Sequence, residues 1–263
     1  MERVKLDFEG GVAVLKFNHP EVMNAVGAQM QEDLFEAVAE IKDPNNGARC
    51  VLLTGEGRGF CAGANLQDTG GSENGRKRSG AGDSLRTSYH PLLFQLRELD
   101  MPIVTAVNGA AAGVGMSFAM MGDIVCASRN AYFLQAFARI GLVPDGGSTY
   151  MLPRLVGWGR AMELSMLAER LPAETAHEWG LVNRVYDDND ALMDGAMEIA
   201  NRLANGPRSI GLIRRAYWES WSNSFEQQLD LEARLQNQAG SSRDFKEGVS
   251  AFLEKRDAQF TGE

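Results

Sequence analysis

An α/β fold is predicted for this chain of 263 residues, and three features of its sequence predict it. Apolar strand-like runs alternate with helical stripes over the first 190 residues, a pattern typical of α/β layering. Two of these runs, residues 50–54 and 103–107, lead directly into turns rich in Gly and Ala. From about residue 190 onward only helical spacing remains. We therefore expect a core over residues 1–190 and a helical region over residues 191–263.

The first elements follow from short-range patterns. Residues 4–8 and 12–17 are predicted strands joined at Gly10-Gly11, which is a hairpin signal. Apolar residues three and four apart predict a helix over residues 30–41. The strand at 50–54 follows the turn that ends this helix.

The middle of the chain continues the alternation. Residues 67–84 are rich in Gly, Ser, Asn and charge, and we expect a mobile loop there. Leucines on one face predict a helix over residues 91–99, and strands are predicted at 103–107 and 123–127. Helical spacing predicts the last elements, over residues 192–203, 210–221, 225–239 and 245–253.

Composition and charge argue against several classes of partner. The 35 acidic and 26 basic residues give a net charge of −9, which disfavours nucleic acid or an anionic membrane as the main partner. The three cysteines have no metal-type spacing, so we expect reduced core residues and no metal site. The N-terminus lacks an apolar signal core and no stretch reaches membrane-spanning length, so a cytoplasmic protein is expected.

Two glycine-rich segments are the first indication of a binding or catalytic site. Residues 60–66 (FCAGANL) and 108–116 (NGAAAGVGM) each follow a predicted strand. Turns with almost no side chain let backbone N–H groups approach a ligand closely. Two such turns can aim two N–H donors at one carbonyl oxygen, which is the arrangement of an oxyanion hole. Either segment alone is more simply a strand-to-helix turn.

These segments and the motifs around them resemble the crotonase superfamily, the enoyl-CoA hydratases and isomerases. The resemblance covers essentially the whole chain and includes Asn18-His19-Pro20, Gly122-Asp123-Ile124 and residues 140–145 (IGLVPD). The segment 137–147 (FARIGLVPDGG) and the tail 247–256 (EGVSAFLEKR) are most similar to the 1,2-epoxyphenylacetyl-CoA isomerase and enoyl-CoA isomerase branch.

The resemblance implies a fold, a ligand and an assembly. The family's fold is a spiral of ββα units followed by a C-terminal helical region that trimerises. Residues 1–190 would then be the acyl-CoA-binding catalytic core and residues 191–263 the oligomerisation region, in a homotrimer or a dimer of trimers. The substrate would be a coenzyme A thioester, with no further cofactor.

The resemblance also implies an oxyanion hole formed by the backbone N–H groups of Ala64 and Val114. Enolate formation beside a thioester moves negative charge onto its oxygen, and fixed N–H donors stabilise that charge without reorganising. Val114 stands where the family often has glycine, so its φ is expected to be negative. The positions expected to contact substrate or coenzyme A are Ala62, Gly63, Ala64, Leu66, Gly113, Val114, Phe137 and Lys255.

Proton transfer in such an enzyme needs a side chain that acts as a base. Hydratases of this family use two glutamates, and their positions carry Ser117 and Phe137 here, neither of which can act as a carboxylate base. The carboxylate that remains in a matching motif is Asp145, which the resemblance assigns as the single base of an isomerase. An apolar lining from Phe137 and Leu142 would raise its pKa. The competing interpretation of Asp145 is an N-cap for the helix that follows it.

These arguments favour an acyl-CoA isomerase. It would rearrange 1,2-epoxyphenylacetyl-CoA to an oxepin, or shift a double bond from a 3-enoyl-CoA to a 2-enoyl-CoA. Three alternatives stay open: an enoyl-CoA hydratase, a hydrolytic acyl-CoA dehalogenase in which His90 assists Asp145, and a non-catalytic acyl-CoA binder.

Overall fold

Two β-sheets organise the computed structural model, which describes residues 1–66 and 81–263. The larger sheet has the order β1-β2-β3-β5-β7-β10 and the smaller one has the order β4-β6-β8-β9. The predicted hairpin is present, because β1 (Val4–Glu9) pairs with β2 (Val12–Phe17) in antiparallel register. From β2 onward the large sheet is parallel and continues through β3 (Cys50–Gly55), β5 (Ile103–Val107), β7 (Ile124–Ser128) and β10 (Arg184–Tyr186).

The chain alternates between the two sheets and so repeats a ββα unit. A short strand of the small sheet follows each of three large-sheet strands: β4 (Gly59–Cys61), β6 (Ala110–Ala112) and β8 (Tyr132–Leu134), with β9 (Leu171–Pro172) at the sheet's edge. Helices then follow in turn, among them α3 (His90–Arg97), α4 (Val114–Ala119) and α5 (Ser148–Val156). The predicted ββα spiral is confirmed. The strands β4 and β6 lie inside the glycine-rich segments, where we expected only turns.

Helices cover both faces of the large sheet. Because side chains alternate along a strand, β2 directs Val12 and Val14 to one face and Leu15 to the other. The first face packs against α8 (Asn189–Ala204), and α1 (Ala28–Lys42) contributes to the core on the second. Strands covered on both sides are buried along their length, which explains the continuous apolar runs in the sequence.

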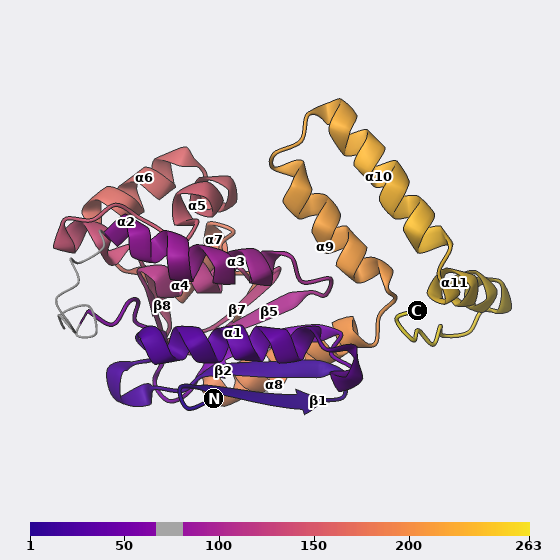
Figure 1. Cartoon of the computed structure of the whole chain (residues 1–263), viewed down its shortest axis with the longest axis horizontal. Helices are drawn as coiled ribbons and strands as arrows, with labels where there is room; N and C mark the ends of the chain where they lie inside the picture. Colours follow the sequence, from indigo (N-terminus) through magenta and orange to yellow (C-terminus); the bar gives the residue numbers. More distant parts are fainter. Residues whose placement is uncertain (67–80) are drawn as a thin grey trace.

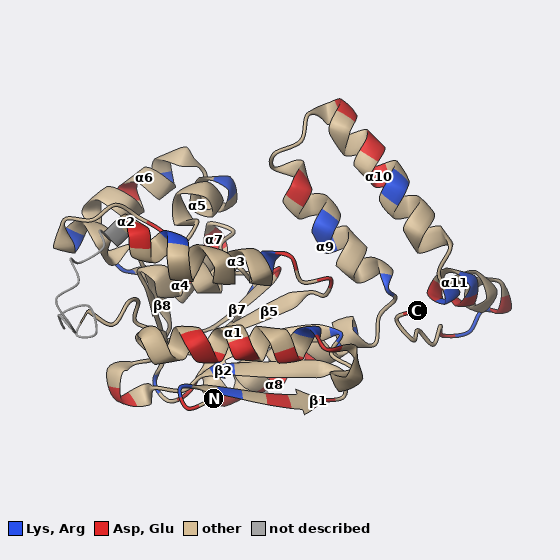
Figure 2. Cartoon of the chain, in the orientation of Figure 1, with Lys and Arg blue, Asp and Glu red and all other residues tan. Residues whose placement is uncertain are grey.

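The remaining C-terminal helices extend away from the sheets (Figure 1). They are α9 (Ser209–Ser220), α10 (Phe225–Gly240) and α11 (Arg243–Glu254), at the positions that the helical spacing predicted. Helices α9 and α10 share a small buried apolar cluster, which consists of Leu212, Leu231 and Leu235. Acidic and basic residues both occur along α9 and α10 (Figure 2). The boundary proposed at residue 190 stays a prediction.

The segment between β4 and α3 differs from the expectation of a loop over residues 67–84. Residues 67–80 lie outside the described part of the chain. Residues 81–84 form α2 (Ala81–Ser84), which continues through a π-helical turn, Leu85–Tyr89, into α3. The loop prediction was wrong for these four residues, because their backbone is continuous with a helix that packs on the core.

The short helices complete the architecture. They are 3-10 turns at Pro20–Val22, Pro44–Asn46 and Ala136–Ile140, together with α6 (Trp158–Leu167) and α7 (Ala173–Glu178). The turn Ala136–Ile140 leads into the segment that carries Asp145.

Candidate active site

The two glycine-rich segments touch each other at the carboxyl ends of β3 and β5. Strands β4 and β6 pair in parallel, and a Cβ atom added to Gly63 would lie 3.8 Å from the Gly113 Cα. A Cβ atom added to Gly115 would lie 2.1 Å from the carbonyl oxygen of Cys61. Glycine at 115 is therefore required by the close approach of the two backbones.

Ala64 and Val114 each present a backbone N–H group with no acceptor in the part of the chain that the structure describes. Val114 is the first residue of α4, where helix N–H groups lack intrahelical acceptors, and its φ is negative as expected. Around Ala64, the neighbouring groups are engaged: Val26 N–H donates to the Gly63 oxygen at 2.7 Å, and Asn65 N–H donates to the Val26 oxygen at 2.9 Å. Two free donors on touching turns have the composition that an oxyanion hole requires.

The other residues of the glycine-rich segment 60–66 differ in whether their N–H groups and side chains are free to contact a ligand. The N–H group of Ala62 donates to the Met23 oxygen at 2.9 Å, so it has no free donor for a ligand. Leu66 is exposed at the end of the described segment. Cys61 is buried, and burial raises the pKa of its thiol to about 12, so the sulfur is protonated at neutral pH and is no nucleophile.

Asp145 lies beside Val114, in the segment between the turn Ala136–Ile140 and α5. A Cβ atom added to Gly146 would lie 3.1 Å from the Val114 Cγ2 atom, so the two segments are in contact. Burial raises the pKa of the Asp145 carboxyl to about 6, and the charge of His90 acts in the opposite direction. Its Oδ1 atom is buried without a hydrogen-bond partner among the described residues.

The structure tests the N-cap interpretation of Asp145. The N-cap of α5 is Gly147, and no side chain makes a capping hydrogen bond there. The N-cap interpretation is therefore wrong. Ser117 and Phe137, at the positions that carry glutamates in hydratases, are both buried. The Phe137 ring lies against the second glycine-rich segment, 3.8 Å from a Cβ atom added to Gly113, whereas Leu142 is exposed.

A cavity of about 340 Å³ opens next to Gly146 and Gly147. Its walls come from α3, α5 and α9, and His90 lies among them. They are mainly apolar, with Leu93, Phe94, Met121, Tyr150, Met151 and Trp218. No local pattern in α9 identifies Trp218 as a wall of this cavity, because the contact depends on how the C-terminal helices return to the core.

Lys255 is the predicted site residue that the fold does not bring to the others. It is exposed at the C-terminal end of α11. Figure 1 shows α11 on the opposite side of the molecule from α2 and α4. Within one chain Lys255 therefore lies apart from Ala64 and Asp145, and its contact with coenzyme A stays a prediction.

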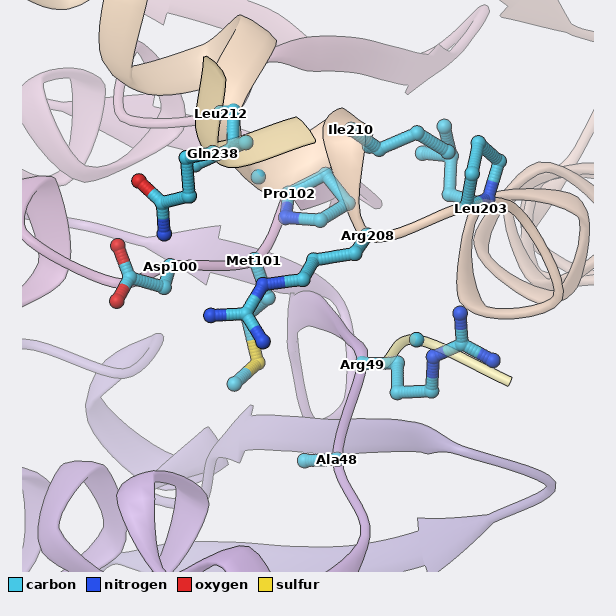
Figure 3. A pocket seen from close by; sticks show the side chains of 13 residues that line it. Ala48, Arg49, Asp100, Met101, Pro102, Leu203, Arg208, Ile210, Leu212 and Gln238 are labelled. Atoms are coloured by element: carbon cyan, nitrogen blue, oxygen red, sulfur yellow. The ribbon is translucent and has the colours of Figure 1, made fainter. Parts of the chain in front are cut away.

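A second cavity, of about 190 Å³, lies at the other ends of β3 and β5 (Figure 3). Arg49, Asp100 and Arg208 are among the residues that line it. Arg49 donates hydrogen bonds to the carbonyl oxygens of Gly206 and Phe260, so this region joins the core to the C-terminal helices and tail. It is separate from the site at the glycine-rich segments.

Comparison with known proteins identifies the family. The family model for enoyl-CoA hydratase/isomerase matches residues 7–263. The chain belongs to this family of enzymes. It is 44% identical to the 1,2-epoxyphenylacetyl-CoA isomerase of Escherichia coli (strain K12), over 100% of this chain and 99% of that protein. It is 42% identical to a protein of Rhodobacter capsulatus named probable enoyl-CoA hydratase, over 98% of each.

Solved structures of this enoyl-CoA hydratase/isomerase family have the same fold. The crystal structure of an enoyl-CoA hydratase from Polaromonas sp. JS666 is 34% identical and matches with a TM-score of 0.88, over 98% of this chain and 99% of that one. The family resemblance drawn from the sequence is thereby confirmed. Among the described residues, no helix is both long enough and apolar enough to cross a membrane.

Proposed function

We propose that this chain is an acyl-CoA isomerase with Asp145 as its single base. The observation that carries the proposal is the setting of this carboxyl group: partial burial raises its pKa to about 6, and the next residue, Gly146, lies close to Val114. Ser117 and Phe137 stand where hydratases of the family carry glutamates. One base can move a proton between two carbons, whereas hydration also needs a group that activates water.

In the proposed reaction, the N–H groups of Ala64 and Val114 donate to the thioester oxygen. Asp145 takes a proton from the α-carbon of a 3-enoyl-CoA, and the electron pair of the broken C–H bond forms a dienolate with its charge on that oxygen. The same carboxyl group returns the proton to the γ-carbon, which gives the 2-enoyl-CoA. Loss of one donor from such a hole raises the barrier by about 3–4 kcal/mol.

A ring-epoxidised phenylacetyl-CoA, rearranged to an oxepin, is the other substrate class that we propose. The name of the Escherichia coli relative supports it. The apolar cavity beside Gly146 also supports it, since Phe94, Tyr150 and Trp218 would pack against an aromatic ring.

We propose that coenzyme A binds along Ala62, Gly63, Ala64 and Leu66, with the acyl end near Gly113, Val114 and Phe137, and that no further cofactor takes part. Lys255 would reach a coenzyme A phosphate only on a neighbouring copy, in a homotrimer or a dimer of trimers. Exposed apolar side chains on α9, α10 and α11 support such an assembly. The three buried free cysteines are in keeping with a cytoplasmic location.

Turnover of defined thioesters tests the proposal. We expect conversion of 3-hexenoyl-CoA or of 1,2-epoxyphenylacetyl-CoA, and a loss of about 10²–10⁴ in kcat on Asp145→Asn while coenzyme A binding is retained. Conversion of neither substrate, or unchanged turnover by the variant, contradicts the assignment.

An enoyl-CoA hydratase is the second candidate, and the name of the Rhodobacter capsulatus relative favours it. Crotonyl-CoA separates the two functions in the same assay. Hydration at rates comparable with the isomerisation would mean that another group activates water.

A further inference from the structure

The carbonyl group of Asp145 receives two buried hydroxyl hydrogen bonds. Ser117 Oγ donates to the Asp145 oxygen at 3.0 Å, and Ser148 Oγ donates to it at 2.8 Å. The backbone N–H of Ser148 donates to the same oxygen at 3.0 Å. Both serines are at most 1% exposed. From this geometry we propose that Ser117 and Ser148 are positioning residues that set the location of the Asp145 carboxylate relative to the Val114 N–H.

The two serines restrain the Asp145 segment in different ways. Ser148 is three residues from Asp145 and closes a local turn at the start of α5. Ser117 is 28 residues away and lies on α4, about one turn after Val114. The Ser117 hydrogen bond therefore links the helix that presents the proposed oxyanion donor directly to the segment that carries the proposed base.

Close packing reinforces this link. A Cβ atom added to Gly146 would lie 2.8 Å from the Ser117 Oγ atom and 2.9 Å from the Ser117 Cβ atom. Ser117 thus leaves no room for a side chain at position 146, and the glycine there lets the Asp145 segment pack close to α4.

The restraint matters because the side chain of Asp145 has little to hold it. Its Oδ1 atom has no hydrogen-bond partner in the described part of the chain. The position of the carboxylate therefore depends on where its backbone is held. A displacement of about 1 Å at a reacting group lowers the rate by about 10²-fold, so loss of the backbone restraint should lower kcat. This inference about Ser117 and Ser148 rests on the proposed role of Asp145 as base.

The experiment compares Ser117→Ala, Ser148→Ala and the double variant with Ser128→Ala. Ser128 is a matched control, since it is also 1% exposed and its hydroxyl has no hydrogen-bond partner among the described residues.

The kinetic assay uses 3-hexenoyl-CoA or 1,2-epoxyphenylacetyl-CoA, whichever the native enzyme converts. We expect each single Ser117 or Ser148 variant to lower kcat about 10-fold and the double variant to lower it about 10²-fold. KM should stay within about twofold, because both hydroxyls donate to the Asp145 backbone. Ser128→Ala should leave kcat unchanged.

A second readout does not depend on turnover. Hydrogen–deuterium exchange over residues 139–150 should be faster in Ser117→Ala than in the native chain, and unchanged in Ser128→Ala. Native exchange and native kcat in Ser117→Ala would overturn the inference. Failure of the proposed function would give a different result: Asp145→Asn would then keep full activity, because Asp145 would not be the base. Ser117→Glu also lacks the hydroxyl that donates to Asp145, so it should lower isomerisation at least as much as Ser117→Ala does; native kcat in Ser117→Glu would also overturn the inference.

Discussion

At the scale of the residue, the properties of Asp145 follow from its burial. An exposed aspartate is a weak base at neutral pH, but removing water from the carboxylate disfavours its charged form. Here burial raises the pKa of Asp145 to about 6. The group is then mostly ionised at pH 7 and is a stronger base than an ordinary aspartate.

The pH dependence of turnover should report this group. Because only the carboxylate accepts a proton, kcat/KM should rise with pH through an apparent pKa of about 6. His90→Gln should move this limb to higher pH, because the charge of His90 lowers the pKa of Asp145. His177→Gln is the control, since the His177 ring nitrogen contacts the Val182 oxygen at 2.8 Å and should leave the profile unchanged. A profile without a limb between pH 5 and 7 would contradict the role of Asp145.

The raised pKa of Asp145 should also make the free energy of unfolding depend on pH. A carboxyl whose folded pKa is raised contributes stability below its unfolded pKa of 3.8 and loses it as pH rises through about 6. Asp145→Asn cannot ionise, so its stability relative to the native chain should increase between pH 4 and pH 8, by about 1–2 kcal/mol because solvent screens this partly exposed group. Thermal unfolding of both proteins across this range measures the change. A difference that is independent of pH would show that Asp145 is not desolvated.

At the scale of the element, α9 is held to the core by one buried arginine. Arg214 donates through Nε to Asp123 Oδ2 at 2.7 Å and through its other nitrogens to the carbonyl oxygens of Leu96, Arg97 and Leu99 at the end of α3. One turn later, Trp218 Nε1 donates to Asp123 Oδ1 at 3.3 Å. This set of bonds fixes the helix that supplies Trp218 to the cavity beside Gly146.

Replacement of Arg214 should therefore affect both stability and the cavity. Arg214→Met leaves Asp123 without its charged partner and should destabilise the protein by about 3–5 kcal/mol. Arg215→Met is the control, because Arg215 pairs with Glu219 on the exposed face of the same helix, where such a pair contributes about 0.3–0.5 kcal/mol. Denaturant unfolding of the two variants measures the difference, and equal effects would contradict the anchoring role of Arg214.

At the scale of the whole molecule, the C-terminal helices leave apolar side chains uncovered. Phe252 and Leu253 on α11 are 82% and 73% exposed, and Tyr217 and Phe225 are also exposed on α9 and α10. Apolar surface of this kind marks an interface between proteins. In the proposed homotrimer or dimer of trimers, a second copy of the chain would cover this surface.

Sedimentation should therefore give a species of three or six times the 28.7 kDa mass of the chain. The double replacement Phe252→Glu and Leu253→Glu puts charges into the proposed interface and should shift the species toward smaller assemblies. Phe8→Glu, on the edge strand β1, should leave the mass unchanged. A monomeric native protein would contradict the assembly.

The elements that were predicted well are those with strong local signals. The hairpin was marked by Gly10-Gly11, the strands β3 and β5 by continuous apolar runs, and α8 to α11 by helical spacing. The strands β4 and β6 were missed because Gly and Ala give no strand signal, and β10 because only three residues of it pair with β7.

The sequence by itself determined the α/β fold, the family, and the residue types at the site, since periodicity and motif order are local properties of the chain. Only the tertiary structure decided that the two glycine-rich backbones touch, that Ser117 is bonded to the Asp145 carbonyl, and that Trp218 lines the cavity. The physical reason is that desolvation and contact depend on which distant segments meet. Local patterns specify the segments, and packing of the whole chain brings them together.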